Sequence, residues 1–142
     1  MDGIAKPVIA IVDDDRRVRE SLESLIESAG FTARVFSLAE DFLQGGLLAR
    51  TSCLITDVRM PGMGGLDLQR CVRLERPELP VIFITGHHED EVEQCALAQG
   101  AASFISKPFD AGELLRAIKI ALSKTSENHE TTLQRSRKKV RS

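Results

Sequence analysis

Four apolar segments of this 142-residue chain are each followed directly by a residue that could take part in chemistry. Asp13 and Asp14 follow the first segment, and Asp57, Thr85 and Lys107 follow three later ones. These side chains form a site only if the fold brings the ends of the segments together. Two carboxylates about 4 Å apart repel each other by about 4 kcal/mol at an effective dielectric constant near 20. A cluster of the three aspartates therefore requires a raised pKa or a bound cation.

The same set of side chains has the composition of a phosphoryl-transfer site. Carboxylate oxygens suit Mg²⁺, which keeps several waters and takes phosphate oxygens as further ligands, and Mn²⁺ could replace it. The ammonium group of Lys107 would bind another phosphate oxygen, and Thr85 supplies a hydroxyl. Asp57 is the candidate nucleophile, since a carboxylate that attacks phosphorus forms an aspartyl phosphate. Without Asp57, Thr85 and Lys107, the acidic run at Asp13 would be an ordinary solvated helix start.

Five short apolar segments, rich in β-branched residues, alternate with five stretches of helical periodicity. The segments lack the alternation of half-exposed strands, so we predict strands that are covered on both faces. The predicted strands cover residues 8–12, 31–36, 53–56, 80–84 and 102–105, and the predicted helices 16–29, 37–43, 66–75, 89–99 and 110–122. This pattern predicts an α/β fold with a doubly wound, five-stranded parallel sheet and five helices. Right-handed crossovers place the carboxyl ends of such strands along one edge, where ligands bind.

Three helix starts carry capping signals. Ser37 with Glu40, and Asp110 with Glu113, have the spacing of a capping box. Asp15 is the predicted cap of the first helix.

The composition is that of an ordinary globular domain, with 42% apolar and 28% charged residues. No apolar run approaches the roughly 20 residues that span a bilayer. The N-terminal region also lacks a secretory signal pattern, so we expect a cytoplasmic protein with no membrane partner. Cys53, Cys71 and Cys95 have no paired ligand spacing, which indicates buried thiols rather than a zinc site.

The net charge of −2 conceals a basic C-terminal end. Residues 123–142 carry six Lys and Arg against two Glu, a net +4, which leaves −6 for the rest of the chain. We therefore expect one acidic domain over residues 1–123 and a basic linker or tail over residues 124–142. The tail could touch nucleic acid, or it could continue the last helix toward a dimer, but a solvated linker is the simpler interpretation.

With these residues in this order, the chain resembles the receiver domain of two-component response regulators. The resemblance covers about residues 6–123. Its motifs are VDDD at 12–15, DVRMPG at 57–62, TG at 85–86 and KPF at 107–109. The segments VRMP at 58–61, FITGH at 83–87 and KPFD at 107–110 are most similar to the FixJ-type branch. The sequence departs from that branch at His88-Glu89, where a Gly-Asp pair is usual.

The resemblance implies the sheet order 2-1-3-4-5 of the flavodoxin-like and receiver folds. It also implies that Asp57 is the phosphoacceptor. Asp14 would then bind Mg²⁺ directly, Asp13 largely through water, and the backbone carbonyl of Arg59 would be a further ligand.

It further implies that Thr85 and Lys107 contact the phosphoryl group and that Phe104 is the switch aromatic residue. Thr85 would move toward the phosphoryl group and let the Phe104 ring turn inward. Arg59 and His87, each two residues after a site residue, could rim the site and tune how long the phosphoryl group survives. Their alternative role is that of ordinary surface residues.

The implied partners are a sensor histidine kinase and, after phosphorylation, a second copy of the chain, bound through the face of the last helix and strand. The implied output is transcriptional, through a DNA-binding helix-turn-helix domain that these 142 residues do not contain. Such a domain is not an enzyme beyond Mg²⁺-dependent self-phosphorylation and autodephosphorylation. A receiver that acts only by docking to other proteins stays open as an alternative.

A haloacid-dehalogenase-like phosphatase is a second alternative. It also uses Mg²⁺ and an aspartyl phosphate, and Asp13 and Asp15 have its Asp-x-Asp spacing. The presence of Asp57 and the shortness of the chain argue against it.

Overall fold

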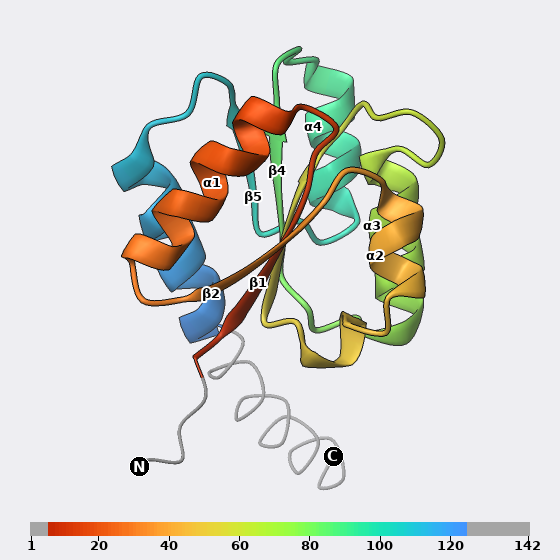
Figure 1. The fold of residues 1–142 in the computed structure, drawn as a ribbon. Helices are drawn as coiled ribbons and strands as arrows, with labels where there is room; N and C mark the ends of the chain where they lie inside the picture. The colour runs from red at the N-terminus through yellow and green to blue at the C-terminus, as the bar shows by residue number, and fades with distance from the viewer. Residues whose placement is uncertain (1–5, 125–142) are drawn as a thin grey trace, which may run out of the picture.

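The apolar segments form one parallel sheet (Figure 1). The structure is a computed structural model, and it describes residues 6–124. The strands are β1 (Val8–Val12), β2 (Thr32–Phe36), β3 (Cys53–Asp57), β4 (Val81–Thr85) and β5 (Ser103–Ser106). They lie in the order β2-β1-β3-β4-β5, and every neighbouring pair is parallel. Every residue of β3 and β4 is buried, because helices cover both faces of these central strands. The predicted fold class and strand order are confirmed.

Five helices connect or follow the strands. They are α1 (Arg16–Ser28), α2 (Ala39–Gln44), α3 (Gly65–Glu75), α4 (Asp90–Ala98) and a last helix over residues 111–124. Figure 1 shows α1 and the last helix on one face of the sheet and α2, α3 and α4 on the other. The sequence analysis missed a short 3-10 helix, η1 (Leu48–Arg50), which lies between α2 and β3.

Each face of the sheet has its own hydrophobic core, and alternate residues of β1 serve the two cores. Ile9 and Ile11 pack toward α1 and the last helix, whereas Ala10 and Val12 pack toward α2, α3 and α4. The sheet is therefore a rigid frame that fixes the positions of the strand ends.

The capping predictions had different outcomes. Asp15 accepts the N–H of Arg17 at 2.9 Å and caps α1, as predicted. Asp110 accepts the N–H of Glu113 at 2.8 Å at the start of the last helix. The box at Ser37 is wrong: α2 begins at Ala39, after Leu38, and no side chain caps it.

The strand register brings the strand ends to one edge of the sheet. Val12 pairs with Thr56, so Asp13, just after β1, and Asp57, the last residue of β3, stand at the same level on adjacent strands. Thr85 pairs with Ser106, so Lys107 lies one residue beyond the level of Thr85 on the neighbouring strand. Within residues 6–124, no helix has the length and apolar character to cross a membrane. The predicted basic tail lies outside the described residues, apart from residue 124.

Candidate functional site

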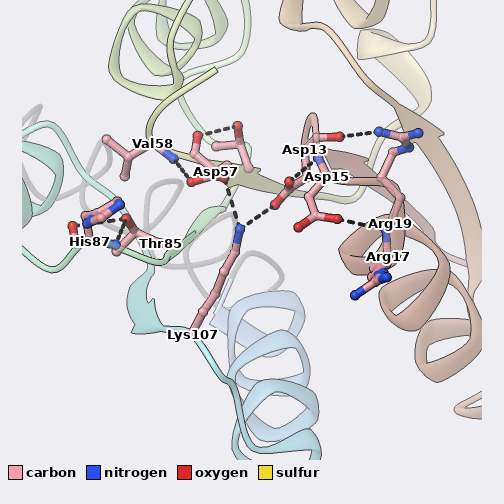
Figure 2. A network of polar contacts seen from close by, with 10 residues as sticks. Asp13, Asp15, Arg17, Arg19, Asp57, Val58, Thr85, His87 and Lys107 are labelled. Atoms are coloured by element: carbon pink, nitrogen blue, oxygen red, sulfur yellow. Dashed lines mark hydrogen bonds and ion pairs between the residues drawn. The ribbon is translucent and has the colours of Figure 1, made fainter. Parts of the chain in front are cut away.

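Lys107 joins the two central aspartates of the site (Figure 2). Its Nζ donates to Oδ2 of Asp57 at 3.0 Å and to Oδ2 of Asp13 at 3.0 Å. The three residues come from the ends of β5, β3 and β1, and the carboxylates of Asp13 and Asp57 are nearly buried. The convergence that the sequence predicted for these three residues is therefore present.

Backbone groups hold the two carboxylates in place. Oδ1 of Asp57 accepts the N–H of Val58 at 2.7 Å, and Oδ1 of Asp13 accepts the N–H of Asp15 at 2.8 Å. Each carboxylate is thus bonded through one oxygen to its own loop and through the other to Lys107, which prevents free rotation (Figure 2).

Two supporting residues were missed by the sequence analysis. The Arg19 guanidinium donates to the backbone carbonyl of Asp13 at 2.9 Å, and the Thr56 hydroxyl donates to the backbone carbonyl of Asp57 at 3.0 Å. Thr56 is fully buried on β3. Neither residue carries a sequence signal, because an arginine on a helix and a threonine in a strand are common.

The charges of the site perturb one another. Burial raises the pKa of Asp13, and the negative charge of Asp57 raises it further, although the Asp15 N–H and Lys107 oppose this change. Burial by itself would lower the pKa of Lys107, but its hydrogen bonds to Asp57 and Asp13 outweigh that effect and raise it. The site thus stabilises the protonated form of Lys107, while it disfavours the ionised form of Asp13.

The third aspartate completes an all-oxygen group. Asp13, Asp14 and Asp57 each offer a carboxylate oxygen within 4.8 Å of the others, and Asp14 is exposed to solvent. Three carboxylates against the one ammonium of Lys107 leave negative charge that a small divalent cation would balance. The donor atoms and charge of the site therefore fit Mg²⁺.

Thr85 is in the predicted place, but its hydroxyl is bonded within its own loop. Its Oγ1 accepts the N–H of His87 at 3.1 Å and donates to the carbonyl of His87 at 3.1 Å (Figure 2). Thr85 is buried at the end of β4. The predicted contact of this hydroxyl with a phosphoryl group would require it to leave His87.

Phe104 lies half-buried on β5, between a core ring and a surface ring. Its ring centroid is 5.9 Å from that of the buried Phe83 and 5.7 Å from that of His88. His88 also contacts Glu93 on α4 at 2.6 Å through Nε2. His88, which the sequence analysis did not assign to the site, thus links Phe104 to α4.

The geometry agrees with comparisons to known proteins. The chain matches the family model of the response regulator receiver domain over residues 9–119. It belongs to this family. The resemblance found in the sequence is therefore confirmed.

Relatives of this receiver domain are response regulators. It is 45% identical to the response regulator protein TodT of Pseudomonas putida over 115 residues, which cover 81% of this chain and 51% of TodT. It is 37% identical to the transcriptional regulatory protein FixJ of Azorhizobium caulinodans over 119 residues, covering 84% of this chain and 56% of FixJ. The chain thus spans about half the length of these curated relatives.

Solved structures of response regulators share the fold. That of the response regulator StyR has a TM-score of 0.81 and 37% identity, and the match covers 94% of this chain and 67% of StyR.

The two predicted rim residues of the receiver domain lie at one open cavity of about 590 Å³. Arg59, Gly86, His87, His88 and Glu89 line it. An ion pair between Arg59 and Glu89 joins the loop after β3 to the loop after β4. His87 is exposed and meets Thr85 through its backbone. The His88-Glu89 pair, where the sequence departs from the FixJ branch, thus contributes to this cavity.

Proposed function

We propose that this receiver domain accepts a phosphoryl group on Asp57 from a sensor histidine kinase, with Mg²⁺, and that phosphorylation controls a transcriptional output. The observation that carries the proposal is the position of Lys107. Its Nζ lies 3.0 Å from the carboxylates of both Asp57 and Asp13, so a fixed ammonium group stands beside the candidate nucleophile. Phosphoryl transfer depends on such positioning and charge neutralisation.

In the proposed reaction, an Asp57 carboxylate oxygen forms a bond to phosphorus while the bond from phosphorus to the kinase histidine nitrogen breaks. The imidazole leaves with the electron pair of that bond and takes up a proton from solvent. In the second half of the cycle, the oxygen of a water molecule forms a bond to phosphorus while the bond from phosphorus to the Asp57 oxygen breaks. Inorganic phosphate leaves, a proton goes to solvent, and the Asp57 carboxylate is restored.

The residues that would hold the metal are Asp14, Asp13, Asp57 and the backbone carbonyl of Arg59. A bound Mg²⁺ or Mn²⁺ would supply neutralisation of the phosphoryl oxygens. Lys107 keeps its charge because its two carboxylate partners raise its pKa, and it can therefore bind one phosphoryl oxygen.

We assign the switch to Thr85 and Phe104. Thr85 would exchange its bonds to His87 for one to the phosphoryl group, and the Phe104 ring would turn inward. This ring is part of β5 and lies against His88, so the turn would alter the face of β5 and the last helix. That surface is the proposed homodimer contact of the phosphorylated form.

The transcriptional output is proposed from the relatives. FixJ is named a transcriptional regulatory protein, and the present chain covers 56% of its length. We propose residues 1–123 as the receiver domain and residues 124–142 as a basic linker to a DNA-binding domain. Docking to other proteins alone is the alternative output.

The lifetime of the phosphoryl group is proposed to depend on Arg59 and His87. Both residues line the cavity beside the site, and Gly86 of the same loop would meet the Lys107 side chain at 3.9 Å if it carried a Cβ. Water that reaches phosphorus from this side would pass these side chains.

Incubation with Mg²⁺ and acetyl phosphate tests the proposal, with intact mass and size-exclusion chromatography as the measurements. The expected product carries one phosphoryl group, an increase of about 80 Da for phosphorylation at one residue, and elutes as a dimer. Asp57→Asn should take up none. An absent adduct in the wild type, or an adduct that persists in Asp57→Asn, would refute the assignment of Asp57.

A further inference from the structure

Glu40 on α2 reaches the loop that follows Asp57, formed by residues 58–64. Its Oε2 accepts the backbone N–H of Met63 at 3.1 Å, across 23 residues of sequence. Gly62 packs directly against the same carboxylate, because a Cβ on Gly62 would lie 2.6 Å from Oε2. Gly62 also has a φ of +73°, so this turn of the loop favours glycine on two grounds. Glu40, assigned from the sequence to a capping box, instead contacts a distant loop.

The helix that carries Glu40 is firmly anchored. Ala39 and Phe42, on either side of it, are fully buried, and the Phe42 ring packs edge-on against Phe36 at 5.5 Å between centroids. Oε1 of Glu40 is buried with no hydrogen-bond partner among the described residues, so the bond to Met63 orients the carboxylate. Glu40 is thus a fixed support rather than a mobile surface acid.

The loop is bonded to the end of β3 at its start, and its two ends are bonded to each other. At its start, the Val58 N–H donates to the Asp57 carboxylate at 2.7 Å, and at its end the Gly65 N–H donates to the Val58 carbonyl at 2.8 Å. Between these points lies Arg59, whose side chain pairs with Glu89 of the loop after β4. Glu40 and Glu89 therefore hold the loop from α2 and from the loop after β4.

We propose that Glu40 is a positioning residue for the metal site: it sets the place of the loop and thereby of the Arg59 carbonyl. The inference rests on the proposed function, in which that carbonyl is a Mg²⁺ ligand. Glu40 acts through the backbone and touches neither the metal nor the phosphoryl group. Its loss weakens Mg²⁺ binding more than it changes the reaction at saturating Mg²⁺.

The experiment compares Glu40→Ala, Glu40→Asp and Glu40→Gln with the wild type. Mg²⁺ binding is measured by calorimetry, and the rate of phosphorylation by acetyl phosphate is measured across Mg²⁺ concentrations. Glu40→Ala and the shortened Glu40→Asp should each raise the half-saturating Mg²⁺ concentration by about tenfold, as loss of a residue that orients metal ligands does. Glu40→Gln should restore the wild-type value, because its amide oxygen can accept the same N–H of Met63.

Asp41→Ala is the matched control, since Asp41 is an exposed acid in the same turn of α2. It should keep the wild-type half-saturating concentration. If Glu40→Ala fails to fold, Glu40→Asp decides the question. Folded variants with wild-type Mg²⁺ binding would overturn the inference. A wild type that binds Mg²⁺ but takes up no phosphoryl group would instead refute the proposed function, and the calorimetry would still test Glu40.

Discussion

The Thr85 hydroxyl makes two hydrogen bonds to the backbone of His87, one to its N–H and one to its carbonyl, each 3.1 Å long. The same hydroxyl cannot keep both bonds and also bind a phosphoryl group on Asp57. The His87 backbone is therefore a direct reporter of the proposed switch.

The first prediction concerns this reporter. Addition of beryllofluoride, which mimics the phosphoryl group, together with Mg²⁺ should shift the His87 amide resonance strongly, because the Thr85 hydroxyl that accepts this amide turns its proton from the His87 carbonyl to the phosphoryl group and moves. The measurement is a pair of ¹H–¹⁵N correlation spectra. Thr85→Val has no hydroxyl, so its His87 resonance should respond far less, and the variant should lose about 1 kcal/mol of stability for the missing bonds. An unmoved His87 amide in the wild type would refute the switch.

The second prediction concerns the ion pair of Arg59 and Glu89, two residues that line the cavity beside the site. Both side chains are about half exposed, at 61% and 46%, and such pairs contribute at most about 1 kcal/mol. If breaking the pair opens the path for water, Arg59→Ala and Glu89→Ala should each speed loss of the phosphoryl group, by at most about fivefold for that energy. Decay of the phosphorylated protein is measured by mass spectrometry.

A double variant distinguishes the effect of the ion pair from the separate effects of Arg59 and Glu89. Arg59→Ala with Glu89→Ala should decay no faster than either single variant, because both remove the same contact. Arg16→Ala removes another exposed ion pair, with Glu20 on α1, and should leave the decay rate unchanged. Additive effects of the two substitutions would show that the ion pair does not control the access of water to the phosphoryl group.

The third prediction concerns Cys53, which is fully buried in β3. Burial raises the pKa of its thiol from 9.0 to about 12. Above 9.0 the thiol ionises in the unfolded chain while it stays protonated in the folded one, so its contribution to stability is complete below 9.0 and is lost as the pH rises toward 12. Between about pH 8 and about pH 10, the wild type should lose on the order of 1 kcal/mol more unfolding free energy than Cys53→Ala. Urea denaturation at both pH values measures this difference, and equal losses would contradict it.

The fourth prediction compares two helix starts that look alike in sequence. Asp110 accepts the Glu113 N–H, so Asp110→Ala should lower the free energy of unfolding by about 1 kcal/mol. Ser37 precedes a helix that no side chain caps, and Ser37→Ala should change it by less than about 0.5 kcal/mol. Thermal or urea denaturation of the two variants checks both values. Equal destabilisation would mean that Ser37 has a structural role after all.

The sheet and the identity of the central site residues follow from the amino-acid pattern alone. Long apolar, β-branched runs leave few alternatives to buried parallel strands, and residues at their carboxyl ends must meet at one edge. The places of Asp13, Asp57 and Lys107 therefore followed from local pattern and topology alone. The cap at Asp110 also followed, because it depends only on residues within one helical turn.

The neighbours that hold these residues depend on the folded chain. Glu40 and Asp110 belong to similar sequence patterns, yet Glu40 bonds to Met63, 23 residues away, and leaves the start of α2 uncapped. Likewise, nothing local indicates that Arg59 pairs with Glu89. Such partners depend on how loops from different strands approach one another in space, and a short-range pattern carries no information about that distance.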